Sequence, residues 1–154
     1  MNPEIQSIIQ DMEEVFCGNP WYGKAVLTLL DEIDSSKVYI KANGISHSLI
    51  ELLYHMLTWQ EYTQHQLENK LDLSTYQLLD WTETNPEIHT WNTGIAELKA
   101  SHNKIINLLQ DAPDDLLEKE VQFKKFSTRV LLHGMIQHNI YHIGQIAYVN
   151  KLLS

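Results

Sequence analysis

The sequence holds one cysteine, only four prolines and a shortage of basic residues. The single cysteine, Cys17, cannot form a disulfide within the chain, which fits a reducing cytoplasm. No apolar run reaches the roughly 18 residues of a membrane-spanning helix. The first residues lack the basic stretch followed by an apolar one that marks a signal peptide. We therefore expect a cytoplasmic protein with no membrane partner.

The shortage of basic residues also bears on partners. Eleven Lys and Arg stand against 20 Asp and Glu, which gives a formal net charge of −9. Binding to nucleic acid requires Lys and Arg gathered on one face. No such cluster appears, and Lys119, Lys124 and Lys125 stand among the acidic Glu118 and Glu120. The charge pattern predicts that nucleic acid is not a partner.

The 154 residues are 44% hydrophobic and 20% charged, which is typical of one globular domain with its own core. Apolar residues recur at helical spacing through most of the chain, and no stretch shows the alternation of a strand. We expect a single all-α domain over residues 1–154, built as a four-helix bundle.

The first helical region begins at Asn2, a residue that caps helices, followed by Pro3 at the first helical position. The pattern is broken at 18–20, where the sequence reads Gly-Asn-Pro, and resumes over 21–31. This region is either one kinked helix or two short ones.

The second helix is expected from Ser48 to about Lys70. Ser48 and Glu51 fit a capping box, in which each side chain bonds to a free backbone N–H of the first turn. Residues 71–85 have little periodicity and predict a long connection, with a short turn around 76–81 as an option.

The third helix is expected from the pair Asn85-Pro86 to about Gln110, with Ile88 in its buried stripe. The fourth is expected to begin at Ser127 as cap and to end near Leu152.

The fourth predicted helix carries His138 and His142, four residues apart and therefore on one helix face. Two such imidazoles can reach one metal ion, and a catalytic site of this kind needs a third protein ligand. His55 is the best candidate, because it lies within the apolar face of the second helix, where an unpartnered imidazole is costly. The alternative is a core histidine bonded to a backbone carbonyl or a carboxylate.

Other side chains compete for the third position. His47 lies just outside the second helix, and Glu51 already has a role in the capping box. His133 lies well round the fourth helix from the pair. The remaining histidines stand among polar residues, where we expect them to be solvated: His65, His89 and His102.

The neighbours of the pair also have candidate roles. Tyr141 and Gln145 each lie three residues after a histidine of the pair and could orient a ligand or a metal-held water. Alternatively, they are a tyrosine at a helix seam and a glutamine bonded to another helix. Gly144 costs a helix about 1 kcal/mol against alanine, which we attribute to close approach by a neighbouring helix.

Two stretches of the sequence resemble the DinB/YfiT-like superfamily of metal-dependent four-helix bundles. They are His47–Trp59, which reads HSLIELLYHMLTW, and Gly134–Ile146, which reads GMIQHNIYHIGQI. A weaker match is Pro20–Gly23, and the order of helices extends the likeness over nearly the whole chain. The resemblance implies a divalent ion bound by His55, His138 and His142, in agreement with the independent argument above.

The resemblance also implies a class of activity. Members include S-transferases and isomerases that use a low-molecular-weight thiol such as bacillithiol or mycothiol, and many members have no known activity. Dimers are common in the family, which suggests a homodimer here. Relatives often carry Asp at the position of Asn139, so the tuning of the ligands can differ.

The function expected from these observations is metal-dependent catalysis on a small-molecule substrate. Transfer of a thiol to an electrophile and metal-assisted hydrolysis both fit a three-histidine site with an open position, with Tyr141 and Gln145 as the candidate catalytic side chains. Zinc and nickel both suit imidazole ligands. The alternatives are a non-catalytic bundle that binds a small ligand or acts in stress response with a structural or vestigial metal, and a metal-free bundle. Cys17 is a weak candidate for a catalytic thiol.

Overall fold

The computed structural model describes residues 1–44, 47–72, 80–81 and 83–154. Within these residues the regular structure is helical, and extended pairing is limited to one bridge between Glu120 and Ser127. The all-α class is therefore confirmed. The longer helices are α1 (Pro3–Cys17), α2 (Val26–Glu32), α3 (Leu49–Leu67), α5 (Trp91–Gln110) and α6 (Thr128–Leu153), and the short 3-10 turns are η1 (Ser35–Lys37), η2 (Ala42–Gly44) and η3 (Leu116–Glu118).

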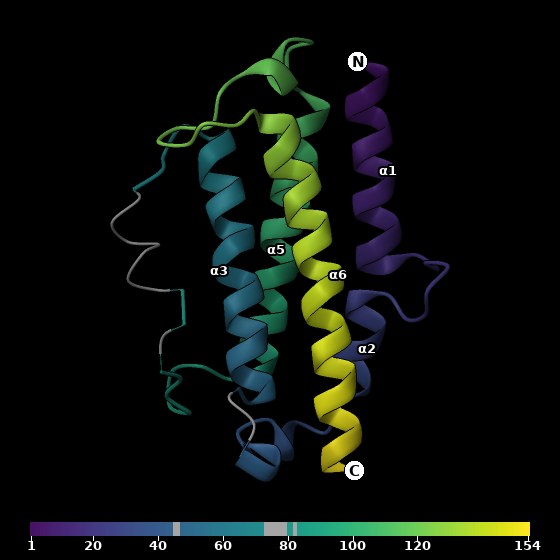
Figure 1. Ribbon diagram of the computed structural model, residues 1–154, viewed down its shortest axis with the longest axis vertical. Coiled ribbons are helices and arrows are strands. Elements are labelled where there is room, and N and C mark those ends of the chain that lie inside the picture. Colours follow the sequence, from purple (N-terminus) through teal and green to yellow (C-terminus); the bar gives the residue numbers. More distant parts are fainter. Residues whose placement is uncertain (45–46, 73–79, 82) are drawn as a thin grey trace.

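The first helical region forms two helices, the second of the two alternatives. The Asn2 side chain accepts a hydrogen bond from the backbone N–H of Glu4 at 2.8 Å, and Pro3 opens α1 as expected. α1 ends at Cys17, before the Gly-Asn-Pro break. In Figure 1, α2 continues in the direction of α1 beside the lower half of α6. Together α1 and α2 form one column of the bundle.

The capping box of α3 is present as predicted. The backbone N–H of Ser48 donates to Glu51 Oε2 at 2.6 Å, and the backbone N–H of Glu51 donates to Ser48 Oγ at 3.4 Å. α3 ends at Leu67, three residues before the predicted end. Ser127 lies at the cap position of α6 with an extended backbone, although its side chain makes no capping bond within the described chain.

The prediction that the third helix begins at Asn85-Pro86 was wrong. The backbone N–H groups of Ile88 and His89 both donate to the Asn85 carbonyl, which closes a single turn. α5 begins instead at Trp91, where Thr90 Oγ1 accepts from the backbone N–H of Thr93 at 3.2 Å. Ile88, expected in the buried stripe, is 67% exposed.

The connection between α3 and α5 follows from the direction of the helices. In Figure 1 the chain descends through α1 and α2, ascends through both α3 and α5, and descends through α6. Because α3 and α5 run in the same direction, the end of α3 and the start of α5 lie at opposite ends of the bundle. Of the turn expected around 76–81, residues 76–79 lie outside the described residues, whereas Asp80 and Trp81 form a turn beside α3.

The core fills the space between the columns. α3 packs against both α5 and α6. A Cβ on Gly94 of α5 would lie 2.8 Å from Leu53 Cδ2 and 3.0 Å from Tyr54 Cε2 on α3, so these two helices approach closely. None of the described helices combines the length and the apolarity that crossing a membrane demands.

Candidate metal centre

Three histidine rings converge between α3 and α6. His55 comes from α3, and His138 and His142 come from successive turns of α6. Their ring centroids are 5.0 Å apart for His55 and His138, 4.6 Å for His55 and His142, and 4.3 Å for His138 and His142. One nitrogen from each ring lies within 4.8 Å of the other two. The structure therefore brings together the three rings that the sequence argument proposed as metal ligands.

Hydrogen bonds outside the triad orient two of these rings. His55 Nδ1 lies 2.8 Å from the carbonyl oxygen of Asp80 and 3.2 Å from its carboxylate oxygen Oδ1. Since a carbonyl oxygen only accepts, His55 carries its hydrogen on Nδ1 and presents the Nε2 lone pair to the triad. His142 Nδ1 lies 2.6 Å from Gln145 Oε1, which fixes His142 in the same way.

His138 has no such support. Its Nε2 lies 3.1 Å from Nε2 of His55, and its Nδ1 is buried with no hydrogen-bond partner among the described residues. Burial lowers the pKa of His138 to about 3, with the nearby His142 and His55 adding to the effect. Burial also lowers the pKa values of His55 and His142. At neutral pH all three rings are uncharged, and uncharged imidazole is the form that binds metals.

Trp81 covers the outer side of the triad. Its indole is stacked between His55 and His47, with ring centroids 3.7 Å apart on each side. His47, the main rival for the third position, is thus separated from the triad by a whole aromatic ring. Glu51, the other rival, is held by Ser48 and by Lys41, whose Nζ lies 3.2 Å from Glu51 Oε1.

The structure places the two candidate catalytic side chains on α6 beside His142. Gln145 holds His142 as described above. Tyr141 is 64% exposed, and its ring meets that of His142 edge-on with centroids 5.0 Å apart. Both residues line a cavity of about 410 Å³, here called the Gly144 cavity. Its other lining residues are His47, Leu52, Gly144, Tyr148 and Val149.

The expectation that Gly144 allows a close helix approach was wrong. A Cβ built at Gly144 has no atom within 4 Å, so the position faces open space in the cavity. Close approach occurs at Gly94 instead. The sequence alone cannot separate these two cases, because a glycine in a helix is compatible with either.

Comparison with known proteins identifies the family of this chain. The model of the DinB superfamily matches residues 23–146. The chain belongs to the DinB superfamily. No curated protein matches it.

Two solved structures show the same DinB-like fold at low sequence identity. An uncharacterised protein from Escherichia coli UTI89 is 15% identical with a TM-score of 0.69, over 97% of this chain and 92% of that one. The colibactin self-resistance protein ClbS, solved in complex with a double-stranded DNA, is 14% identical with a TM-score of 0.65, over 97% of this chain and 95% of ClbS. At such identities the likeness concerns the fold alone.

The donor set of this DinB-superfamily chain fits a divalent ion. Two nitrogens bound to one zinc at about 2.0–2.1 Å, at angles near 90–110°, lie roughly 2.9–3.4 Å apart. The 3.1 Å between Nε2 of His55 and Nε2 of His138 falls in this range. Among the described residues the group has three members, so no fourth side chain closes it.

Sequence reasoning missed Asp80 and Trp81 as parts of the site. Asp80 is further held by Trp59, whose indole N–H donates to Asp80 Oδ1 at 2.6 Å. The sequence offered one signal, an acidic residue next to a tryptophan in a connection without clear periodicity. This signal does not indicate that the two residues contact α3.

The sequence argument also expected His102 to be solvated, which was wrong. The His102 side chain is buried, with Nε2 lying 3.1 Å from Glu13 Oε1 and the ring stacked on Phe16.

Asn139 is not part of the triad's surroundings. Its side-chain N–H donates to Gln60 Oε1 at 3.0 Å, and Gln60 donates in turn to the Leu98 carbonyl at 3.0 Å. These bonds link α6, α3 and α5 in the buried interior. The residue at position 139 therefore acts on helix packing here, and its hydrogen bond does not reach the three histidines.

Proposed function

We propose that this chain is a divalent-metal-dependent enzyme acting on a small molecule, with His55, His138 and His142 holding the ion. The observation that carries the proposal is the convergence of three uncharged imidazoles with no fourth side-chain ligand among the described residues. Three protein ligands and one open position are the pattern of catalytic zinc sites, whereas structural sites are closed by a fourth ligand. Zinc and nickel are the preferred ions for this donor set.

The bound ion would supply a Lewis acid that lowers the pKa of a water or thiol at the open position. The protein's part is orientation. The Asp80 carbonyl and carboxylate hold the His55 ring, and Gln145 holds His142. Such outer contacts fix the tautomer of a ligand and raise its basicity.

Transfer of a low-molecular-weight thiol of the bacillithiol type to an electrophile is the reaction we favour, and metal-assisted hydrolysis is the other. The DinB membership supports the first. Tyr141 and Gln145 line the Gly144 cavity next to His142, and we propose that they place a substrate there. Gln145 cannot move far, because its Oε1 is engaged by His142.

We further propose that the partner is a small molecule and that nucleic acid is not one. The ClbS structure contains DNA, but ClbS is only 14% identical to this chain, and the net charge of −9 opposes binding to a polyanion. The homodimer and the cytoplasmic location stay predictions from the sequence.

Elemental analysis tests the metal. Freshly purified protein is expected to hold about one divalent ion per chain, and His142→Ala is expected to lose it. His47→Ala is the matched control, since His47 is separated from the triad by Trp81 and its loss is expected to leave the metal in place. The proposal fails if the wild type neither contains a metal nor takes up added Zn²⁺ or Ni²⁺.

Cobalt substitution tests the open position. In a catalytic site, the visible spectrum of the Co²⁺ protein is expected to change when a low-molecular-weight thiol is added, because the thiol takes the open position. A spectrum that does not respond to thiol would indicate a closed site, and the non-catalytic binding bundle would then be preferred.

A further inference from the structure

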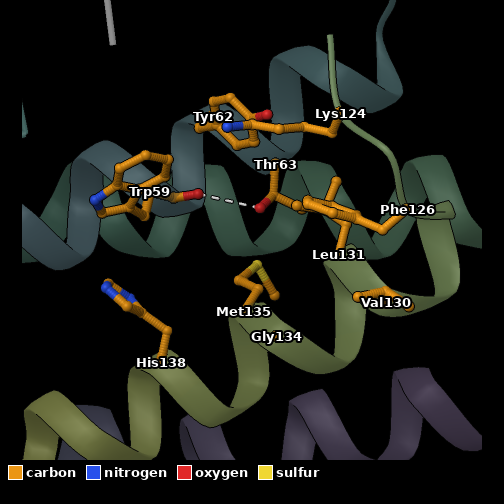
Figure 2. Close-up of a pocket in the computed structure, with 10 residues that line it drawn as sticks. All are labelled: Trp59, Tyr62, Thr63, Lys124, Phe126, Val130, Leu131, Gly134, Met135 and His138. Carbon is orange, nitrogen blue, oxygen red and sulfur yellow. Dashed lines mark hydrogen bonds between the residues drawn. The ribbon is translucent and has the colours of Figure 1, made fainter. Parts of the chain in front are cut away.

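A second cavity, here called the Gly134 cavity, adjoins the triad on the side of His138. It has a volume of about 290 Å³ and lies between α3 and α6. On α6 its lining extends from Val130 to His138, a distance of about 12 Å at ~1.5 Å per residue. Figure 2 shows His138 and Trp59 at one end and Phe126 and Val130 toward the other, with the Lys124 side chain extending from the loop back toward Tyr62. One end of the cavity thus lies at a candidate metal ligand, and the other lies at the 120–127 hairpin.

A glycine keeps this cavity open. Gly134 is in the interior of α6, where alanine would stabilise the helix by about 1 kcal/mol. A Cβ on Gly134 has no atom within 4 Å, so packing does not require the glycine. Any larger side chain at this position would instead extend into the cavity. The open volume beside Gly134 therefore depends on the missing side chain.

The walls of the cavity favour an apolar ligand. Phe126, Leu131 and Met135 contribute hydrocarbon and thioether surface, and Trp59 contributes an aromatic face. The Thr63 hydroxyl already donates a hydrogen bond to the Trp59 carbonyl at 3.1 Å, which is drawn in Figure 2. A wall of this kind recognises a hydrocarbon or aryl group.

One positively charged side chain borders the cavity and has no ion-pair partner among the described residues. Lys124 lines the cavity, and in the described part of the chain it forms no ion pair, although Lys119 pairs with Asp115 and Arg129 with Glu4. In a molecule with a net charge of −9, such a lysine beside an apolar cavity is complementary to an anionic group. The Lys124 backbone is fixed by a turn, in which its N–H donates to the Val121 carbonyl at 3.0 Å.

We propose that the Gly134 cavity binds the apolar body of a small-molecule carboxylate, with the carboxylate at Lys124 and the opposite end of the molecule at His138. This inference rests on the proposed function for the reaction at the His138 end and assigns its substrate class. Gly134 is then a specificity-determining residue, because its missing side chain sets the space available to the ligand.

Calorimetric titration with octanoate and octanamide tests the proposal, since the two probes share a chain and differ in charge. The zinc-loaded wild type is expected to bind octanoate about 5-fold more tightly than octanamide, the upper range for an exposed ion pair. Lys124→Gln is expected to abolish this difference by weakening octanoate alone. Lys125→Gln is the matched control, because Lys125 does not line the cavity, and it is expected to keep the difference.

Gly134→Leu is expected to weaken both probes at least 10-fold by filling the cavity. Should that variant fail to fold, Gly134→Ala serves instead, with an expected gain in stability and a smaller loss of affinity for both probes. Equal binding of octanoate and octanamide to the wild type would overturn the proposal. Unchanged affinity in the folded Gly134 variant would overturn it as well.

Two further measurements separate this inference from the metal site. The titrations are repeated after the metal is removed with EDTA, and octanoate binding that survives supports Lys124 as its anchor. Octanoate binding that disappears with the metal, while Lys124→Gln has no effect, would show that the carboxylate binds the ion and would overturn the proposal. A variant that retains one zinc per chain but no longer binds octanoate has lost only the cavity site. If the proposed metal site is wrong, this is seen instead as a wild type that holds no metal.

Discussion

Phe123 has a backbone conformation that an aromatic residue rarely adopts. Its φ is +64°, at the third position of a turn closed by the bond from the Lys124 N–H to the Val121 carbonyl. Glycine or asparagine is usual there. The ring cannot repay this cost by burial, because the side chain is 65% exposed. The strain is therefore located beside the lysine that lines the Gly134 cavity.

We expect Phe123→Gly to stabilise the protein. Glycine removes a backbone strain of roughly 1–2 kcal/mol, but it also makes the unfolded chain more flexible, which destabilises the folded protein by about 0.4–1 kcal/mol. The net gain in the free energy of unfolding should therefore be about 0.5–1 kcal/mol. Urea unfolding measures it. Gln122→Gly is the control, since Gln122 has no positive φ to relieve and should lose stability. A loss in Phe123→Gly would mean that the ring contributes contacts worth more than the strain.

Asp80 tests the orientation of His55 within the proposed metal site. Asp80→Asn removes the charge 3.2 Å from His55 Nδ1 but keeps the backbone carbonyl. Loss of such an outer contact lowers metal affinity by about 10- to 100-fold, and we expect the lower end because the carbonyl remains. Competition with a chromophoric chelator measures the affinity, with the exposed Asp31→Asn as control. An unchanged affinity would show that the carbonyl alone orients the ring.

Residue spacing was sufficient to find the triad, because each of its members is recognisable locally. His138 and His142 share a helix face by their spacing, and His55 stands out as an imidazole in an apolar stripe. Asp80 could not be found in this way. It lies 25 residues from His55 in a connection without periodicity, and its contact depends on the path of the chain in space.

The helices of this protein use glycine for two opposite purposes. Gly94 lets α5 approach α3, because a Cβ there would lie 2.8 Å from Leu53 Cδ2. Gly134 and Gly144 face open cavities on α6. The same residue type thus closes one helix interface and opens two spaces beside the histidines.

A pair of alanine substitutions distinguishes these purposes. Gly144→Ala should raise the free energy of unfolding by up to about 1 kcal/mol, since only helix propensity changes. Gly94→Ala should lower it by about 1–2 kcal/mol, because overpacking of the buried Leu53 outweighs the same propensity gain. Chemical denaturation of both variants measures the difference. Equal effects of the two substitutions would contradict the assignment of Gly94 to a close helix contact and of Gly144 to an open space.

Helix boundaries were predictable where the cap is local. Asn2 with Pro3, and Ser48 with Glu51, are complete signals within four residues, and both helices begin where expected. The start of α5 was not predictable to the same degree. Asn85-Pro86 and Thr90 are both acceptable starts, and the apolar Trp91, whose indole N–H donates to the Leu30 carbonyl at 3.2 Å, gives the later start a contact in the core.

At the scale of the molecule, the parallel direction of α3 and α5 decides how the site is assembled. A short loop would have made these helices antiparallel, and Asp80 and Trp81 would then have had no path beside α3. The length of the weakly patterned 71–85 stretch was visible in the sequence, but its direction was not. The bundle class therefore follows from periodicity, whereas the positions of Asp80 and Trp81 beside the three histidines follow from topology.

The stability of the whole molecule should depend on pH through a group far from the triad. His102 of α5 is buried against α1, with Nε2 3.1 Å from Glu13 Oε1. Burial lowers the pKa of His102, and the nearby Glu13 carboxylate opposes this shift without cancelling it. In the unfolded chain a histidine titrates near pH 6.5. Below that pH the unfolded state binds a proton that the folded state does not, so the free energy of unfolding falls as the pH falls from about 7.5 toward 5.5.

The variant His102→Gln isolates this contribution, because glutamine does not titrate and the triad's own contribution is common to both proteins. The wild type should be more stable than the variant at pH 7.5, since its imidazole stacks on Phe16 with centroids 3.8 Å apart. That advantage should shrink as the pH is lowered through 6.5, as measured by urea unfolding at several pH values. His133→Gln, at an exposed position on α6, is the control for loss of an imidazole as such. An advantage that is constant with pH would mean that His102 binds protons equally in the folded and unfolded states, and a growing one would mean that Glu13 outweighs burial.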